Sequence, residues 1–280
     1  MIHEQKSFYF IDTHCHIMHM IGKTATAAFS ETEAQEIRKI LHQADQAGVT
    51  HIIEVATTQT ESVLAVELSK LYGNIFPVVG IHPHEASTYH PDDLRALHRL
   101  VATHHERIVG IGECGLDRHY PDHNLPAQQD LFKAQIELAL TYDKALVVHT
   151  RDAQDETYTM LQEYKDQLKR VTIHCYSNDL QFAQAVTAWG WFLGIGGTVT
   201  YPKNGYLRDI VTALGLTSLV LETDAPFLPP QSIRGKPNTP DQVATIAAYL
   251  AQILDCTLHE VAQQTTHNAE KLFNLVAARR

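Results

Sequence analysis

Short apolar segments alternate along the chain with longer stretches whose apolar positions recur at helical spacing. Eight of the short segments are rich in Val, Ile and aromatic residues, and they are apolar nearly throughout. Such runs are typical of parallel strands that are buried on both faces. The predicted strands are Phe8–Ile11, His51–Val55, Phe76–Ile81, Ile108–Ile111, Ala145–Val148, Val171–Ile173, Trp191–Ile195 and Leu219–Leu221.

The stretches between these runs predict amphipathic helices. They are Ala34–Ala47, Val63–Tyr72, Pro91–His104, Pro126–Tyr142, Glu156–Leu168, Leu180–Ala188 and the shorter Tyr206–Leu214. Eight strands that alternate with helices predict an α/β fold of the (β/α)8 TIM barrel type. A doubly wound sheet is the alternative. That sheet carries a glycine fingerprint after its first strand, whereas Asp12-Thr13-His14-Cys15-His16 stands there in this chain.

Two further helices are predicted after the last strand. Thr239-Pro240-Asp241-Gln242 offers an N-cap, a first-turn proline and a capping-box glutamine, and Thr257-Leu258-His259-Glu260 offers a second capping box. The chain contains no linker, low-complexity tract or convincing internal repeat. We therefore expect residues 1–280 to form a single domain.

The chain is acidic, since 22 Lys and Arg residues stand against 32 Asp and Glu residues and give a net charge of −10. A protein that holds long nucleic acid electrostatically normally carries a basic stripe, and none is visible. A phosphate ester would have to be neutralised locally, by metal ions or a few placed cations. The first residues contain no apolar leader, and no later run is long enough to cross a bilayer. We expect a soluble, cytoplasmic protein that binds no membrane and needs no obligate protein partner.

The residues that carry chemistry follow the predicted strands. In a parallel barrel the active site lies at the carboxyl ends of the strands. Metal-binding or titratable residue types stand directly after six of the eight strands. These segments are Asp12–His16, Ile81–His84, Gly112–Asp117, Val148–Asp152, His174–Ser177 and Glu222–Pro226.

This distribution predicts a metal centre. Side chains two residues apart on a strand share a face, so His14 and His16 can hold one ion together. The predicted ligands are His14, His16, Glu113, His149, His174 and Asp224. Glu113 is expected to bridge two ions, because each carboxylate oxygen can bind one. His14, His16 and Asp224 would complete one site, and His149 and His174 the other.

We expect one or two divalent cations per chain, and Zn, Mn, Co, Ni and Mg are all compatible with these ligands. Two ions activate a water between them for displacement at phosphorus. The alternation along the strands directs Cys15, Cys114 and Cys175 away from this site. We expect each of these thiols to pack as a small buried apolar group and not to bind metal.

Catalytic and substrate-binding roles follow from the same positions. Asp224 is expected to take the proton of the attacking water beside Glu113. Arg151 lies two residues past His149 and so faces the same mouth, where its guanidinium can grip phosphate oxygens. His82 and His84 either bind substrate and protonate the leaving oxygen or only orient the loop at Pro83. Glu222 and Asp12 are expected to support the ligands without being ligands themselves.

The motifs resemble, in their order along the chain, those of the TatD family of metal-dependent deoxyribonucleases. The resemblance runs from Phe10 to about Leu275 and includes Gln128, Phe132, Gln135 and the segment Asn268–Phe273. The motifs that carry it are Asp-Thr-His-Cys-His (12–16), Gly-Ile-His-Pro-His (80–84), Gly-Glu-Cys-Gly-Leu-Asp (112–117), His-Thr-Arg-Asp-Ala (149–153), His-Cys-Tyr-Ser (174–177) and Glu-Thr-Asp-Ala-Pro (222–226).

The resemblance implies a TIM barrel, a mononuclear or dinuclear divalent site on the six residues named above, and hydrolysis of DNA as a 3′-to-5′ exonuclease. The expected substrate is a DNA end or short single-stranded DNA. The alternative is that the same centre hydrolyses another ester, which would make the protein an aminoacyl-tRNA deacylase, a small phosphodiesterase or a lactonase. Departures from the family pattern at Ile17–Met20, Asn178 and Arg234–Pro240 leave all six ligand positions intact and bear on substrate choice.

Overall fold

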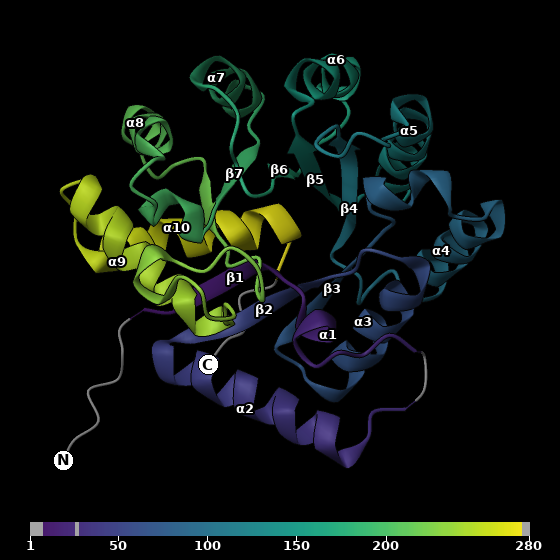
Figure 1. The fold of residues 1–280 in the computed structure, drawn as a ribbon, viewed down its shortest axis with the longest axis horizontal. Coiled ribbons are helices and arrows are strands. Elements are labelled where there is room, and N and C mark those ends of the chain that lie inside the picture. Colours follow the sequence, from purple (N-terminus) through teal and green to yellow (C-terminus); the bar gives the residue numbers. More distant parts are fainter. Residues whose placement is uncertain (1–7, 26–27, 276–280) are drawn as a thin grey trace.

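The computed structural model describes residues 8–25 and 28–275. Its eight strands are all parallel, are hydrogen-bonded in the order β1 to β8, and carry helices on the outside of the resulting barrel (Figure 1). The strands are β1 (Phe10–Cys15), β2 (Val49–Val55), β3 (Ile75–Val79), β4 (Gly110–Asp117), β5 (Ala145–Arg151), β6 (Val171–Ile173), β7 (Phe192–Ile195) and β8 (Leu219–Leu221). The predicted (β/α)8 barrel is confirmed. Residues 1–7, on which the expectation of no leader depends, lie outside the described residues. That residues 1–280 form a single domain stays a prediction.

The helices follow the strands as predicted, with several additions. The α-helices are α1 (Ile17–Met20), α2 (Glu31–Ala47), α3 (Gln59–Leu71), α4 (Pro91–Thr103), α5 (Leu125–Thr141), α6 (Gln154–Tyr164), α7 (Leu180–Ala188), α8 (Gly205–Leu214), α9 (Val243–Ile253) and α10 (Leu258–Phe273). Short 3-10 helices η1 to η4 cover Pro83–Ser87, Gly197–Thr200, Gln231–Ile233 and Pro240–Gln242. Over the described ranges, none of the helices has both the length and the apolarity needed to cross a bilayer.

Some predicted boundaries are wrong, and the clearest case is β4. The prediction ends this strand at Ile111, whereas the strand continues to Asp117. Its second half pairs in parallel with β5, from Cys114 opposite Val148 to Asp117 opposite Arg151. The second half of β4 contains glycines and charged residues, which rarely occupy strands, so its sequence predicts a loop. The consequence is that Glu113 lies within a strand and not beyond one.

The apolar residues form two cores. One lies between the strands and the outer helices and includes Cys15 and Cys114, which are both buried as expected. The other fills the inside of the barrel, where Ile53, Val147 and Val220 meet residues of α10. The α10 residues in this core are Ala269, Leu272 and Phe273. Helix α10 also ties to the start of β8, since Asn268 Nδ2 donates to the carbonyls of Leu216 and Leu219. It therefore closes the amino end of the barrel, opposite the strand ends that carry the chemistry.

The barrel closes between β8 and β1 through a short seam. Cys15 and Ala225 form an isolated parallel bridge. The His16 amide donates to the Ala225 carbonyl at 2.8 Å, and the Asp224 amide donates to the His14 carbonyl at 2.8 Å. Thr13 Oγ1 adds a bond to the Leu221 carbonyl at 2.9 Å. The residues that join the two ends of the sheet are thus the predicted ligands themselves or their neighbours.

Of the two predicted capping boxes, only the second forms. Thr257 Oγ1 accepts from the Glu260 amide while the Glu260 carboxylate accepts from the Thr257 amide, so α10 begins as predicted. Thr239 makes no side-chain cap bond, because Pro240–Gln242 forms a 3-10 turn and α9 begins only at Val243.

A buried carboxylate on β2 holds the turn that follows β1. Glu54 is 1% exposed, and its oxygens accept from the amides of Ile17 at 2.7 Å and Met18 at 3.1 Å. Burial raises the pKa of Glu54 from 4.5 to about 7, although the two amide bonds oppose this shift.

This shift predicts a pH-dependent stability. Between pH 4.5 and about 7 the folded metal-free protein keeps a proton on Glu54 that the unfolded chain has released, so the free energy of unfolding should fall as pH rises. Roughly 3 kcal/mol is expected over this window. Urea unfolding of EDTA-treated wild type and Glu54→Gln at pH 4.5 to 7.5 should show a steeper fall for the wild type. If the free energy of unfolding falls equally with pH in both proteins, the prediction is wrong. Burial also raises the pKa of Asp12, but Asp12 is present in both proteins, so its contribution cancels in the comparison.

Candidate metal centre

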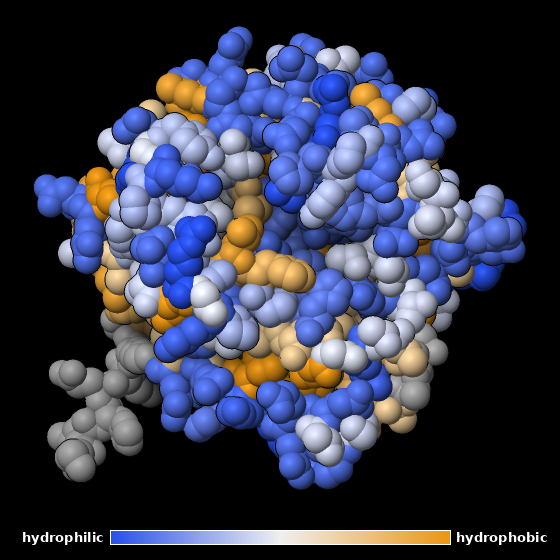
Figure 2. Space-filling model, in the orientation of Figure 1, coloured by the Kyte–Doolittle hydropathy of each residue, from blue (hydrophilic) through white to orange (hydrophobic). Residues whose placement is uncertain are grey.

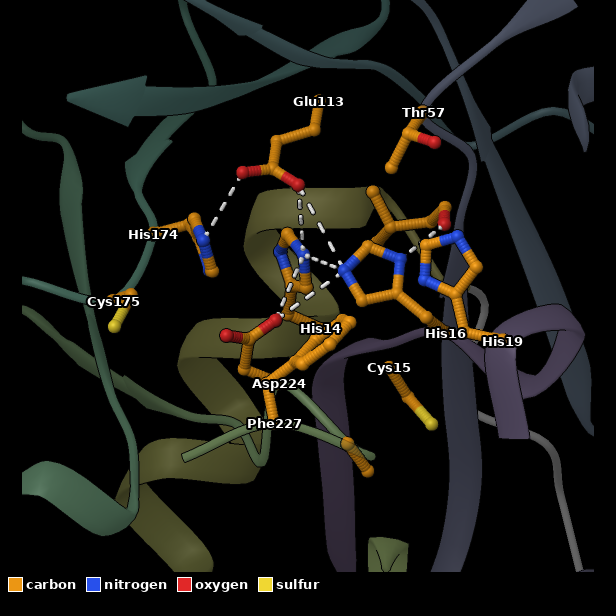
Figure 3. Close-up of polar contacts among 12 residues, drawn as sticks. His14, Cys15, His16, His19, Thr57, Glu113, His174, Cys175, Asp224 and Phe227 are labelled. Atoms are coloured by element: carbon orange, nitrogen blue, oxygen red, sulfur yellow. Dashed lines mark hydrogen bonds and ion pairs between the residues drawn. The ribbon is translucent and has the colours of Figure 1, made fainter. Parts of the chain in front are cut away.

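The structure brings all six predicted ligands together at the carboxyl end of the barrel. Figure 3 shows His14, His16, Glu113, His174 and Asp224 of this set. His14 and His16 project from the end of β1 toward the same point, with their Nε2 atoms 3.1 Å apart. His174, which follows β6, stacks on His14 with ring centroids 3.7 Å apart. The i, i+2 spacing on β1 therefore places both imidazoles as predicted.

Glu113 lies between two groups of histidines. Its Oε2 is 3.4 Å from His14 Nε2 and 3.8 Å from His16 Nε2. Its Oε1 is 2.7 Å from His149 Nδ1 and 3.2 Å from His174 Nε2. Each carboxylate oxygen thus faces a different pair of imidazoles. This is the arrangement that a carboxylate shared between two cations requires.

Asp224 approaches the first pair from the other side. Its Oδ1 is 3.3 Å from His16 Nε2 and 3.8 Å from His14 Nε2. Burial disfavours the charged imidazole of His16, but the bond to Asp224 together with the charges of Asp224, Glu113 and Glu54 outweighs it and raises the pKa of His16 to about 9. Burial, followed by the field of His174, lowers the pKa of His14. In the metal-free protein a proton therefore sits on His16.

The donor set fits a divalent cation. The two imidazole nitrogens lie 3.1 Å apart, and each lies 3.3 to 3.8 Å from an oxygen of Glu113 and an oxygen of Asp224. His14, His16 and Glu113 are almost completely buried. Burial opposes ionisation of Glu113, yet His174, His82 and His14 hold its pKa well below the usual range. A buried site of ionised carboxylates and imidazoles is the usual ligand chemistry for Zn and related metals. Cation binding here must displace the proton from His16.

Two residues outside the predicted ligand set, Asp117 and His84, form a chain that ends on the ligand His149. His149 Nε2 lies 2.9 Å from Asp117 Oδ2, and His84 Nε2 lies 3.0 Å from the same oxygen. Asp117 is 1% exposed. Burial opposes the charge on His149, but Asp117 and Glu113 raise its pKa. Asp117 thus orients a predicted ligand, and His84 reaches the site through Asp117. The signal for Asp117 was present, since it lies four residues after Glu113 on β4 and shares its face.

His82 lies closer to the centre than a substrate-binding role alone requires. Its Nε2 is 3.7 Å from Glu113 Oε1, and it forms with Glu113 and His149 one of the groups whose geometry suits a metal. Burial lowers the pKa of His82 to about 3, so the ring is neutral. Its Nδ1 accepts from the His84 amide at 3.1 Å, which places the ring proton on Nε2.

Glu222 and Asp12 lie behind the ligands, as expected. Glu222 Oε1 lies 3.2 Å from His174 Nδ1, and a Cβ on Gly194 of β7 would clash with this carboxylate. Asp12 accepts from the amide and hydroxyl of Thr223, at 2.9 and 2.6 Å. Gly194 therefore supports the site by leaving room for Glu222, which its sequence position alone did not reveal.

Cys175 corrects one expectation, because it lines the active-site cavity and does not point away from it. Strand β6 ends at Ile173, so the alternation of side chains stops before this residue. Its backbone turns into the left-handed region with φ +44°, and its amide donates to Glu222 Oε1 at 2.6 Å.

A cavity of about 720 Å³ opens over the centre. His82, His84 and Arg151 all line it, as expected for residues that contact substrate. The Arg151 guanidinium lies 5.9 Å from the ring centroid of Tyr120. In Figure 2 the face around this hollow is mainly hydrophilic, with a small apolar strip at its centre. The cavity thus combines a metal-type centre, a cation and apolar surface.

Comparison with known proteins gives a consistent result. Residues 11–274 match the family model described as TatD related DNase. The chain is 33% identical over 266 residues to YjjV of Escherichia coli strain K12, an uncharacterized metal-dependent hydrolase, with 95% of this chain and 98% of that protein covered. It is 30% identical over 264 residues to YabD of Bacillus subtilis strain 168, which carries the same description, with 94% and 98% covered.

Solved structures agree. The crystal structure of the same YjjV, described as a TatD homolog, superposes with a TM-score of 0.86 and covers 95% of this chain and 98% of that chain. A TatD family hydrolase from Entamoeba histolytica has a TM-score of 0.81 at 18% identity, with 96% and 99% covered. At that identity the likeness shows the shared fold alone.

Proposed function

Because the chain belongs to the TatD related DNase family, whose named relatives are metal-dependent hydrolases, we propose that it is a deoxyribonuclease that cleaves DNA phosphodiesters from the 3′ end. The chain is a metal-dependent hydrolase, and the nuclease specificity is the proposed part. The observation that carries the proposal is Glu113, whose two oxygens face two separate pairs of histidines in an open cavity. A centre of this kind suits hydrolysis of phosphate esters.

The residues at the centre would have two roles, metal binding and proton transfer. The six ligands His14, His16, Glu113, His149, His174 and Asp224 would hold one or two divalent ions. Such ions, when bound, polarise a phosphate oxygen and make a water nucleophilic at neutral pH. Asp224 and Glu113 would be the carboxylates that accept the proton of the attacking water.

The residues at the mouth would bind the substrate. Arg151 offers a guanidinium to the phosphate oxygens. His82, neutral and with its proton on Nε2, can donate a hydrogen bond into the cavity. His84 is held by Asp117 beside it. These donors act on a phosphate without a basic surface, which agrees with the net charge of −10 and favours DNA ends or short single strands over long duplexes.

We further propose that the protein acts in the cytoplasm without a membrane or an obligate protein partner. All four cysteines are free, which suits a reducing compartment.

The direct test is digestion of a 5′-labelled single-stranded DNA with added Mg²⁺, Mn²⁺ or Zn²⁺. We expect a ladder that shortens from the 3′ end with at least one metal and no cleavage in EDTA. Shortening from the labelled end would contradict the direction. No cleavage with any of these metals, while elemental analysis finds metal bound, would reject the nuclease and redirect attention to carboxylic esters, lactones or aminoacyl-tRNA.

A further inference from the structure

Exposed apolar side chains gather at the cavity, although the metal centre makes no use of them. In the described part of the chain six large hydrophobic residues are exposed, and four of them line this cavity. These are Tyr120, Tyr206, Phe227 and Leu228, of which Phe227 is 48% exposed. Exposed apolar surface concentrated at the entrance of a site is typical of a surface that binds a ligand.

Phe227 lies closest to the predicted ligands. Its ring centroid is 6.0 Å from that of His16 and 5.7 Å from that of His19, both at steep interplanar angles. Figure 3 shows it beside Asp224, three residues earlier in the chain. A flat group that stacks on Phe227 would therefore lie next to a bond held at the centre.

The backbone fixes Phe227 relative to Asp224. The Phe227 amide donates to the Asp224 carbonyl at 2.8 Å. Asn238, which is fully buried, donates from Nδ2 to the carbonyls of Phe227 at 2.8 Å and Thr223 at 2.7 Å. The backbone that carries the ring is therefore fixed before a ligand binds, which lowers the entropic cost of stacking on it.

The charges of the cavity define what the apolar surface binds. Arg151 and Lys203 line the same cavity as Phe227 and Leu228. The ligand must therefore combine a flat apolar group with a nearby anion. A nucleotide does so, since its base stacks on aromatic side chains whatever its identity while its phosphate binds cations.

We propose that Phe227, with Leu228 beside it, is a stacking platform for a base of the two nucleotides that flank the cleaved bond. This inference rests on the proposed nuclease function and adds a specificity-determining residue to it. A base inside a duplex has both faces covered by its neighbours, so it must leave the stack before it can contact Phe227. The platform therefore favours frayed or single-stranded ends.

The test compares two 5′-labelled single-stranded oligonucleotides that differ only in whether their last two residues carry bases or are abasic. Phe227→Ala should lower kcat/KM about tenfold on the base-bearing substrate, a typical effect of losing one base–aromatic contact. The loss should be clearly smaller on the abasic substrate, and Phe227→Trp should restore cleavage of the base-bearing one. Leu71→Ala removes another exposed apolar residue, which lies on α3 and does not line the cavity, and should match wild type on both.

Equal losses on both substrates, or no loss with Phe227→Ala, would overturn the platform. If wild type cleaves neither oligonucleotide, the nuclease proposal fails. The stacking platform is then tested separately, by calorimetric measurement of the affinity for deoxyadenosine monophosphate and for deoxyribose 5-phosphate. The platform stands if Phe227→Ala weakens only the nucleotide about tenfold. It falls if wild type binds both compounds equally.

Discussion

Replacing Glu113 by Gln should lower kcat/KM on single-stranded DNA by at least about 10³-fold, because bound cations supply several kcal/mol of transition-state stabilisation and about 1.36 kcal/mol corresponds to a factor of ten. The amide keeps the size of the side chain but carries no charge and only one acceptor oxygen. Both histidine pairs therefore lose their anionic partner, and one of them also loses its acceptor oxygen. Metal content after dialysis, measured by elemental analysis, should fall with the activity.

Glu85→Gln is the matched control, since Glu85 lines the same cavity and hydrogen-bonds Thr88 instead of the histidines. It should retain metal and activity. Circular dichroism should show that both variants are folded. A folded Glu113→Gln protein that keeps wild-type metal content and activity would contradict the assignment of Glu113 as the shared ligand.

Asp117→Asn should weaken metal binding and lower kcat/KM by about 10- to 100-fold, the usual effect of removing a carboxylate that orients a metal-binding histidine. The substitution removes the negative charge of the buried carboxylate whose Oδ2 faces His149. Because Asp117 raises the pKa of His149, its removal should also move the acid limb of metal binding to lower pH. Metal titration by calorimetry from pH 5 to 8 measures both effects.

Asp152→Asn gives the comparison for this prediction. Asp152 pairs with His119 at 2.9 Å, but both side chains are exposed and the pair lies outside the ligand set. Exposed pairs contribute little, so metal affinity should stay at the wild-type value. Equal effects from the two substitutions would indicate that charge near the mouth, and not orientation of His149, explains the Asp117 result.

Much of the barrel and the ligand set could be predicted because two regularities act together. Buried parallel strands are continuous apolar runs, and their carboxyl ends meet at one end of the barrel. Residues from strands as far apart as His14 and His174 could therefore be placed in one site without knowing any contact. The i, i+2 rule then selected His14 and His16 and rejected Cys15.

The rest depended on neighbours that are distant in sequence. Asp117 was missed as a partner of His149 because Gly112 and Gly115 made the second half of β4 look like a loop. The role of Gly194 follows only from the Glu222 carboxylate, which comes directly after the adjacent strand β8. Cys175 was assigned the wrong direction because the alternation on which that assignment relied ends with β6. In each case the deciding contact joins segments that are far apart in the chain, whereas the sequence pattern describes one segment at a time.

The seam between β1 and β8 has a consequence for biosynthesis. Thr13 and Leu221, which are bonded across it, lie 208 residues apart, so a ribosome adding about 5–20 residues per second leaves β1 without this partner for roughly 10–40 s. Throughout that time His14 and His16 are translated but Asp224 is not. A nascent or prematurely released chain can therefore contain most of the barrel without a complete ligand set. Hydrolytic activity should therefore appear only after the segment that contains Asp224 has been synthesised.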